Sequence, residues 1–249
     1  MKPYLTGWLV AAILAATQPV QAAELKVLVA EVVEPAIAEL APQFEKSTGH
    51  RLKIEYGFGV EQTKRVQGGE AVDVVVMPNG LIKNPATAAA LAPGTTTELL
   101  RIGQGVAVKK GAPKPDVSSP DAFKQTLLRA KSVAFVPTGQ SGVATQQVFE
   151  KLGIAEEMKA KTKPQKVENV VPAVAKGDAE LALFLNNYLI GAEGVDYAGP
   201  YPGDLQSYIA FSAGVSAKPS DAEAAKAFVK FLGASSAAAT YKKYGMEPG

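Results

Sequence analysis

The sequence predicts an α/β fold of two lobes with a hinged cleft between them. From residue 25 to residue 77, apolar strands alternate with helical segments in the order β-α-β-α-β. This order is typical of a parallel sheet covered by helices on both faces. Two later β-rich runs, at 95–109 and 207–215, are interpreted as strands that cross between the lobes. Two lobes joined by two strands enclose a cleft.

Each element of the first lobe follows from a local pattern. Strands are expected in short runs that are apolar or alternating, at 25–30, 52–56 and 72–77. A helix is expected through Ile37, Leu40 and Phe44, which recur at helical spacing, and it ends at Gly49. A second, polar helix is expected at 60–67 after a glycine-containing turn.

The second lobe is predicted to open with a helix that starts at Ser118-Ser119-Pro120-Asp121. This start combines a hydroxyl cap, a proline in the first turn and an acid near the positive end of the helix dipole. Later strands and helices are expected at 132–136, 141–152, 179–185, 220–232 and 235–244. Residues 220–223 are predicted to form a capping box. The predicted lobes are 24–104 plus 209–249, and 105–208.

The first 22 residues have the pattern of a secretory signal peptide. Lys2 precedes an apolar run at 5–16, and the small-residue stretch 17–22 leads to a cleavage site before Ala23. The apolar run covers about a dozen residues, whereas a membrane span needs about 20. An N-terminal anchor is the alternative. We expect export to the periplasm, cleavage near Ala22 and no membrane insertion of the mature chain.

Composition excludes several classes of function. The chain has no cysteine, so it holds no disulfide, no thiolate metal ligand and no lipid-attached N-terminus. Without Lys2 it carries 25 basic and 24 acidic residues and no basic run, which disfavours nucleic acid as a partner. The one histidine, His50, follows a predicted helix and is expected to be a solvated loop residue. No metal or cofactor is expected.

Three segments resemble one family of binding proteins. They are Val27 to Ala30 before a helix, Gly69 to Val76, and Tyr241 to Met246. In order and spacing they are similar to the periplasmic molybdate-binding family and its wider group of extracellular solute-binding proteins. The resemblance covers nearly the whole chain after the leader. It implies a type II periplasmic-binding-protein fold, a small anion bound in the cleft, and delivery of that anion to an ABC permease.

The resemblance also implies which groups hold the anion, and this sequence departs from them. In that family the donors are serines after the first two strands, amides at helix N-termini, and a tyrosine hydroxyl from the second lobe. Here the serine positions fall on Glu31 and on 58–60, which has no hydroxyl, and the tyrosine position falls near Leu185. The carboxylate of Glu31 repels an anion. The expected ligand is therefore an organic polycarboxylate or an atypical oxyanion, not molybdate.

Helix starts and a few polar side chains remain as candidate ligand groups, because unpaired N–H groups at a helix start suit an anion. The candidate ligand-binding residues are Glu31, Val32, Gly59, Val60, Lys64, Arg65, Gln140, Ser141, Gly142 and Asn186. Several also have a purely structural interpretation. Glu31 is alternatively an exposed helix-capping carboxylate, and Ser141 with Gly142 an ordinary helix N-cap. Asn186 is alternatively a turn residue.

A divergent branch of the same group, the periplasmic aconitate isomerases, resembles the chain as well. The resemblance implies proton transfer across an allylic system between cis- and trans-aconitate, with clamps for the carboxylates and a proton-shuttling group. The candidate clamps are Lys64, Arg65 and Arg101, and the candidate acid and base is Glu31. Lys64 and Arg65 point about 100° apart, so only one faces the cleft squarely. A binding protein is the leading interpretation, and this enzyme is the alternative.

Overall fold

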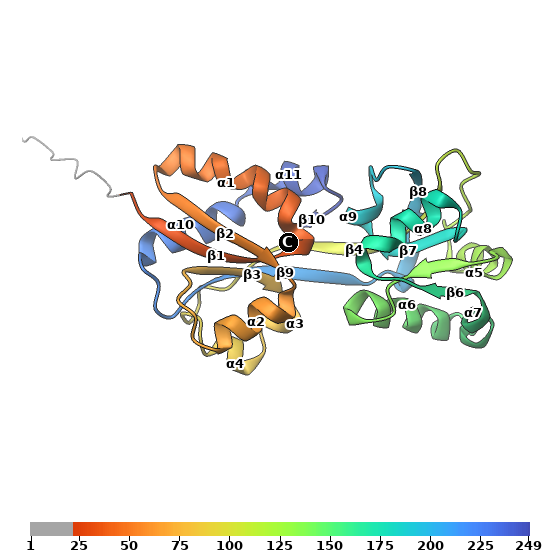
Figure 1. Ribbon diagram of the computed structural model, residues 1–249, viewed down its shortest axis with the longest axis horizontal. Helices are drawn as coiled ribbons and strands as arrows, with labels where there is room; N and C mark the ends of the chain where they lie inside the picture. Colours follow the sequence, from red (N-terminus) through yellow and green to blue (C-terminus); the bar gives the residue numbers. More distant parts are fainter. Residues whose placement is uncertain (1–21) are drawn as a thin grey trace, which may run out of the picture.

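A computed structural model describes residues 22–249 (Figure 1). The signal peptide predicted over 1–22 lies outside these residues except for Ala22. Helices and strands form two groups, and two long strands, β4 (Thr97–Lys109) and β9 (Tyr208–Val215), run between the groups (Figure 1). These are the two strands that were predicted to cross. The fold is the expected two-lobed α/β arrangement.

The first group is a mixed sheet with helices on both faces. β1 (Glu24–Ala30) pairs in parallel with β2 (Arg51–Gly57) and β3 (Val74–Pro78), and β9 pairs antiparallel with β3. One face carries α1 (Glu34–Thr48), α10 (Ala222–Leu232) and α11 (Ala238–Lys243), and the other carries α2 (Gly59–Gln67), α3 (Asn79–Ile82) and α4 (Pro85–Ala88) (Figure 1). The short 3-10 helices η1 (Glu31–Val33) and η4 (Ser235–Ala237) precede α1 and α11.

The second group is a smaller sheet with its own helices. Its strands are β5 (Val133–Phe135), β6 (Thr162–Pro164), β7 (Leu181–Leu185) and β8 (Val195–Pro200). Its helices are α5 (Pro120–Arg129), α6 (Gly139–Lys151), α7 (Ala155–Lys161), η2 (Val167–Asn169), α8 (Val170–Lys176), α9 (Asn186–Leu189) and η3 (Gly203–Leu205). β5 lies parallel to β6 and β7. The last strand, β10 (Glu247–Pro248), returns to pair with β4.

β4 belongs to both sheets. Its first half pairs with β9 as far as Gly103 opposite Tyr208, and its second half pairs with β7 from Gln104 opposite Leu185. β8 pairs with the second half as well. The partners of β4 therefore change between two consecutive residues. We propose lobe boundaries one residue beyond this point, between 104 and 105, and next to the first residue of β9, between 208 and 209.

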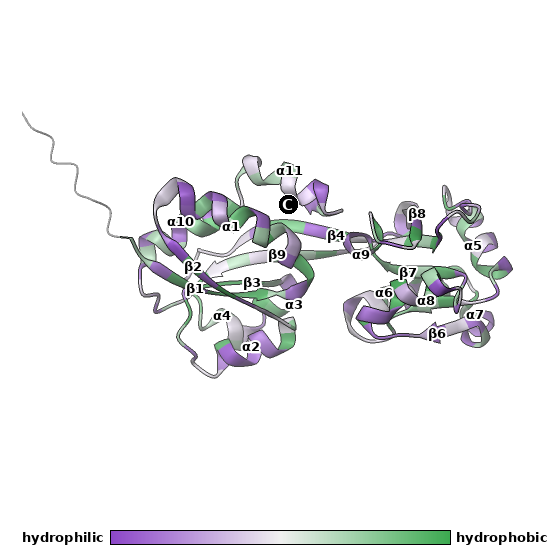
Figure 2. Cartoon of the chain, turned by 45° about the horizontal axis from the view of Figure 1, so that its top comes forward, coloured by the Kyte–Doolittle hydropathy of each residue, from purple (hydrophilic) through white to green (hydrophobic). Residues whose placement is uncertain are grey.

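Burial of the apolar strands accounts for the stability of each lobe. In Figure 2 the strands β3 and β7 are coloured as hydrophobic, and Val74, Val75 and Val76 of β3 are fully buried. Leu181 to Leu185 of β7 are at most 4 % exposed. Runs without polar alternation are typical of strands covered on both faces. Burial of each such side chain contributes about 1.5–3 kcal/mol relative to leaving it exposed.

The helix starts confirm one predicted cap and correct another. Ser119 caps α5 as expected, because its hydroxyl accepts a hydrogen bond from the Ala122 N–H at 3.1 Å. The cap of α10 is Asp221, whose carboxylate accepts from the Ala224 N–H at 2.9 Å. Ser220 does not cap that helix as predicted: its hydroxyl donates to the buried Asp73 at 2.8 Å.

His50 is not the solvated loop residue that the sequence suggested. It is only 7 % exposed, and its ring stacks on Phe44 with the ring centroids 6.0 Å apart. Nδ1 of His50 accepts a hydrogen bond from the Ala23 N–H at 3.2 Å. The residue before β1 therefore binds the ring, a long-range contact that no local pattern indicates.

An ion-pair network holds α2 against β1 and β2. The guanidinium of Arg65 on α2 lies 2.5 Å from carboxylate oxygens of both Glu55 on β2 and Glu70. The ammonium of Lys26 on β1 lies 2.6 Å from Glu70 and 3.5 Å from Glu55. Hydrogen bonds first from Arg65 and then from Lys26 lower the pKa of Glu70 to about 2. Two cations and two carboxylates thus link β1, β2, α2 and the loop after α2 that carries Glu70.

This network predicts a pH-dependent contribution to stability. Since folding lowers the pKa of Glu70 from 4.5 to about 2, its ionised form stabilises the folded state above the unfolded pKa. That contribution is lost as the pH falls through this interval. We expect Glu70→Gln to lower the free energy of unfolding in urea at neutral pH, with a difference from the wild type that shrinks toward pH 2. The exposed Glu193→Gln serves as control. A difference that stays constant across this range contradicts the prediction.

A side-chain amide supports the point where β4 changes partners. Oε1 of Gln206 accepts from the Gln104 N–H at 2.8 Å, and Nε2 of Gln206 donates to the Gln104 carbonyl at 2.9 Å. Gln104 is fully buried, and its own amide donates to the Ser141 carbonyl at 3.3 Å. The Gln206 side chain therefore replaces a strand neighbour at this residue.

Truncating this amide is expected to destabilise the protein. Gln206→Ala leaves the Gln104 N–H without this partner, while the Gln104 carbonyl keeps the hydrogen bond from the Tyr201 N–H at 3.1 Å. The unpaired N–H costs about 1–3 kcal/mol in the free energy of unfolding. The matched control, Gln125→Ala on the exposed face of α5, removes no hydrogen bond of the described chain. Urea denaturation measures both variants. Equal effects at the two positions contradict the role of Gln206.

Candidate functional site

A cleft of about 570 Å³ lies between the two groups of elements. Its walls are the carboxyl ends of the parallel strands β1, β2, β3, β5 and β7 and the segments that follow them. Ile209 and Phe211 of β9 line it where that strand passes from one lobe to the other. Ligands of open α/β sheets bind at the carboxyl ends of the strands. Position alone makes this cleft the candidate site.

Five helical elements begin at this cleft, and none of the five is capped by a side chain. The residues that precede their first turns all line the cleft: Ala30, Phe58, Pro78, Thr138 and Leu185. By contrast, the side-chain-capped helices α4, α5 and α10 begin elsewhere, at Asn84, Ser119 and Asp221. The first N–H groups of a helix lack intrahelical partners. Unpaired amide donors from both lobes therefore gather at one place.

The charged side chains of the cleft are two carboxylates and one ammonium. Glu31, Glu61 and Lys64 line it, and none of them forms an ion pair within residues 22–249. Burial raises the pKa of Glu31, and the charges of Glu34, Glu168 and Glu61 raise it further. Glu31 is thus a partly buried residue of the cleft wall, in the first turn of η1. Its raised pKa brings protonation of this carboxyl closer to neutral pH.

The structure separates the two predicted cations of α2. Lys64 lines the cleft, whereas Arg65 does not and is held by Glu55 and Glu70 in the ion-pair network. Arg101, the other predicted clamp, also lies outside the cleft lining. It pairs with Glu247 at 2.8 Å and stacks over the ring of Tyr208. One of the three expected clamps therefore reaches the site.

Part of the segment at the start of α6 lies at the cleft. Gln140 and Ser141 line the cleft, and Ser141 is 9 % exposed. Gly142 does not line it: a Cβ at this position would lie 2.4 Å from the carbonyl carbon of Pro137. This glycine is required because α6 packs directly on the preceding backbone. Val32, Gly59 and Val60 all line the cleft as expected.

The side chain of Asn186 packs inside the second lobe, and Asn186 is not among the residues that line the cleft. It is 8 % exposed, and its side-chain oxygen accepts a hydrogen bond from the Tyr197 hydroxyl at 3.0 Å. The neighbouring Asn187 reaches the other lobe instead, since Nδ2 of Asn187 donates to the Val32 carbonyl at 2.9 Å. In this structure Asn186 therefore packs inside the second lobe, and its predicted ligand role stays a prediction.

Tyr188 is a cleft residue that sequence reasoning missed. Its ring lines the cleft from the second lobe and packs on Phe184 with the centroids 4.9 Å apart. Burial and then the charge of Glu31 raise the pKa of Tyr188 to about 12, so its hydroxyl stays a hydrogen-bond donor. It lies three residues beyond Leu185, near which the resemblance places the family's tyrosine. The i, i+3 neighbourhood on a helical turn could have indicated it.

Most of the remaining lining is apolar. Side chains on both walls and on β9 contribute, namely Phe58, Leu81, Val136, Phe184 and Phe211. Within residues 22–249, no group of three or more histidine, aspartate or glutamate side chains is arranged to hold a metal ion. None of the helices in that range has the length and apolar character needed to cross a membrane. The site therefore offers amide donors, one cation, two carboxylates and carbon surface.

The amino-acid sequence is similar to one family of known proteins and to individual members of it. It matches the bacterial extracellular solute-binding proteins over residues 25–247. An aconitate isomerase of a Pseudomonas species is 30% identical over 257 residues, with 100% of this chain and 98% of the relative covered. The molybdate-binding protein of Azotobacter vinelandii is 30% identical over 238 residues, with 90% of each chain covered.

Solved structures share the fold. A substrate-binding domain assigned to a molybdenum ABC transporter of Clostridium difficile superposes with a TM-score of 0.79 at 18% identity, covering 91% of this chain and 99% of that one. This likeness places the fold among type II periplasmic binding proteins. Because the family match spans nearly all of the described residues and two relatives reach 30% identity, the chain belongs to the family of bacterial extracellular solute-binding proteins.

Proposed function

We propose that this protein captures a small organic polycarboxylate in the cleft and presents it to an ABC importer from the periplasm, after cleavage of the leader 1–22. The observation that carries the proposal is the meeting of five uncapped helical starts at one cleft. Amide N–H groups at a helix start, together with the helix dipole, bind carboxylates and other anions. Lys64 adds one charge-assisted donor from α2.

The lining favours a carbon-based anion over an inorganic oxyanion. Glu31 stands in the wall where the molybdate-binding family places a neutral serine, and its negative charge opposes a small, fully charged oxyanion. The apolar side chains around it suit the carbon skeleton of an organic acid. Since Glu31 has a raised pKa, a carboxyl of the ligand is able to share a proton with it.

Hydrogen-bond donors from both lobes line the cleft, and this arrangement supports capture of the ligand by closure of the cleft. The donors near Gly59 and Lys64 belong to the first lobe, and those near Ser141 and Tyr188 belong to the second. A ligand favours the closed form only when it binds that form more tightly than the open one. A carboxylate at each end of the ligand satisfies this condition, because each end then contacts a different lobe.

Two measurements test the proposal: the ligand preference of the wild type and the carboxylate affinity of a Lys64 variant. We expect calorimetry to detect binding of succinate, citrate or an aconitate in preference to molybdate, tungstate and phosphate. Lys64→Gln removes a charge-assisted contact of about 1.5–3 kcal/mol, so it should weaken carboxylate binding at least tenfold. Lys218→Gln, which changes an exposed lysine outside the cleft, should leave the dissociation constant unchanged. Binding of molybdate alone contradicts the proposal.

A second candidate function is isomerisation of aconitate in the same cleft. Two observations favour it: a relative with that name is similar over the full length of the chain, and Glu31 is a cleft carboxyl with a raised pKa. In this reaction a base removes a proton from one end of an allylic system, the double bond shifts, and an acid returns a proton to the other end. A carboxyl that titrates nearer neutral pH is suited to both steps.

The variant Glu31→Gln separates the two functions. If the protein only binds, the variant holds carboxylates more tightly and loses a pH dependence: in the wild type, affinity falls as rising pH ionises Glu31. If the protein is an isomerase, the variant loses conversion of cis- to trans-aconitate, followed by proton NMR. Glu193→Gln, which changes an exposed carboxylate outside the cleft lining, should behave as the wild type in both assays. No trans isomer from the wild type rules out the enzyme.

A further inference from the structure

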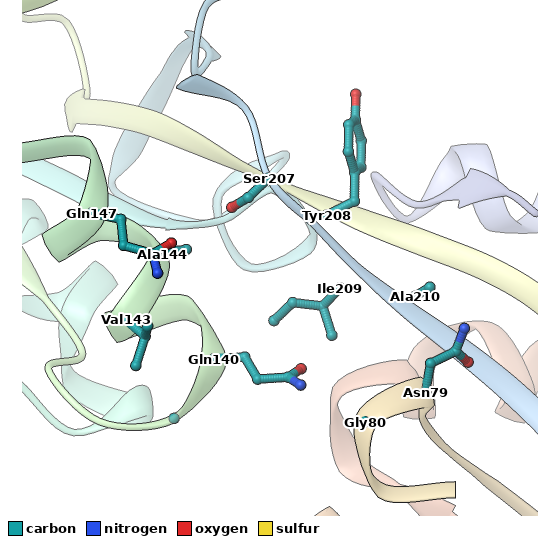
Figure 3. Close-up of a pocket in the computed structure, with 11 residues that line it drawn as sticks. Asn79, Gly80, Gln140, Val143, Ala144, Gln147, Ser207, Tyr208, Ile209 and Ala210 are labelled. Atoms are coloured by element: carbon teal, nitrogen blue, oxygen red, sulfur yellow. The ribbon is translucent and has the colours of Figure 1, made fainter. Parts of the chain in front are cut away.

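A second cavity borders the cleft, and the two differ in charge. It has a volume of about 580 Å³, and none of the side chains that line it is charged. We call it the neutral chamber; Asn79, Gln147, Ser207 and Tyr208 are among its lining residues (Figure 3). The cleft with Glu31, Glu61 and Lys64 lies next to it, since both cavities share Gly139, Gln140 and Ile209.

The side chain of Gln140 lies between the two cavities. Gln140 is on the first turn of α6 in the second lobe, and Figure 3 shows its amide pointing toward Gly80 of α3 in the first lobe. A Cβ built on Gly80 would lie 2.8 Å from Nε2 of Gln140. The amide therefore reaches across the interlobe space to the backbone of the opposite wall. Only a glycine at position 80 leaves room for this approach.

We infer that Gln140 is a specificity-determining residue: it forms an end wall between the charged cleft and the neutral chamber and so limits the length of the ligand. The inference rests on the proposed function, because it concerns the organic carboxylate bound in the cleft. A short di- or tricarboxylate fits on the charged side of Gln140. A carboxylate with a long, uncharged polar tail has to displace the amide to place its tail in the neutral chamber.

The neutral chamber defines the class of ligand that this wall excludes. Its side-chain donors and acceptors include the amide of Gln147 and the hydroxyl of Ser207, groups that suit a neutral amide or hydroxyl. A second carboxylate would lie there without a cationic side chain. The excluded ligands are therefore carboxylates that end in an uncharged polar group several carbons away.

Two substitutions remove the wall in different ways. Gln140→Ala deletes the amide itself. Gly80→Ala keeps Gln140 but places a methyl group where the amide lies, and the flexible glutamine side chain has to move away. Gln147→Ala is the matched control, because it truncates the same residue type on the same helix within the neutral chamber alone. Thermal unfolding of the four proteins confirms that each is folded.

The experiment measures dissociation constants for straight-chain carboxylates that end in an amide, with two to six methylene groups, alongside succinate. We expect the wild type and Gln147→Ala to lose at least tenfold in affinity between the shorter and the longer members. Gln140→Ala and Gly80→Ala should regain at least tenfold for the longer members while succinate binds as before. Each tenfold step corresponds to about 1.4 kcal/mol.

The outcomes distinguish this inference from the function on which it rests. Binding of succinate with the same length profile in all four proteins overturns the role of Gln140 and leaves the proposed function in place. An equal gain in Gln147→Ala also overturns it, since chamber volume alone would then explain the effect. Failure of every carboxylate to bind any of the four proteins overturns the proposed function and the inference together.

Discussion

The whole arrangement depends on one strand that two sheets share. β4 pairs with β9 up to Gly103 and with β7 from Gln104 onward, so each lobe uses half of the same backbone. The amide of Gln206 supports the residue at which the partners change. Because the strand is continuous, the two walls of the cleft keep a defined relation to each other. A small change in backbone angles at this point would move one wall against the other, as the proposed closure of the cleft requires.

The cleft combines two properties that normally oppose each other. Uncapped helical starts from both lobes make it attractive to anions, whereas Glu31 and Glu61 make it repulsive to them. Lys64 offsets only one of these charges. An organic acid resolves the conflict better than a compact oxyanion, since its charges are separated by carbon and one carboxyl can be protonated beside Glu31. The same balance makes Glu31 the residue on which binding and isomerisation differ.

The sequence indicated which residues lie near the cleft and which side chains suit a ligand, but it did not show which residues meet both conditions. Local patterns predicted the helix starts of α2 and α6, and the family resemblance implied that Gly59, Val60 and Ser141 lie at the cleft, where the structure has them. The same patterns also nominated Arg65 and Asn186, whose chemistry suited a ligand. Both are instead used inside a lobe, by carboxylates and by the Tyr197 hydroxyl. Tyr188 was missed because the resemblance directed attention to Leu185.

By itself, the sequence determined the fold class, the crossing strands, the starts of the longer helices and the absence of thiol chemistry. These depend on short-range patterns: period, capping residues and composition. Only the tertiary structure decided which of Lys64 and Arg65 faces the cleft, that His50 is buried, and that Gln140 approaches Gly80. His50 and Gln140 each depend on a partner distant in the chain, and Arg65 depends on how α2 packs beside Glu55 and Glu70. Such contacts are set by how the elements and lobes pack against one another, and local sequence periodicity does not encode that packing.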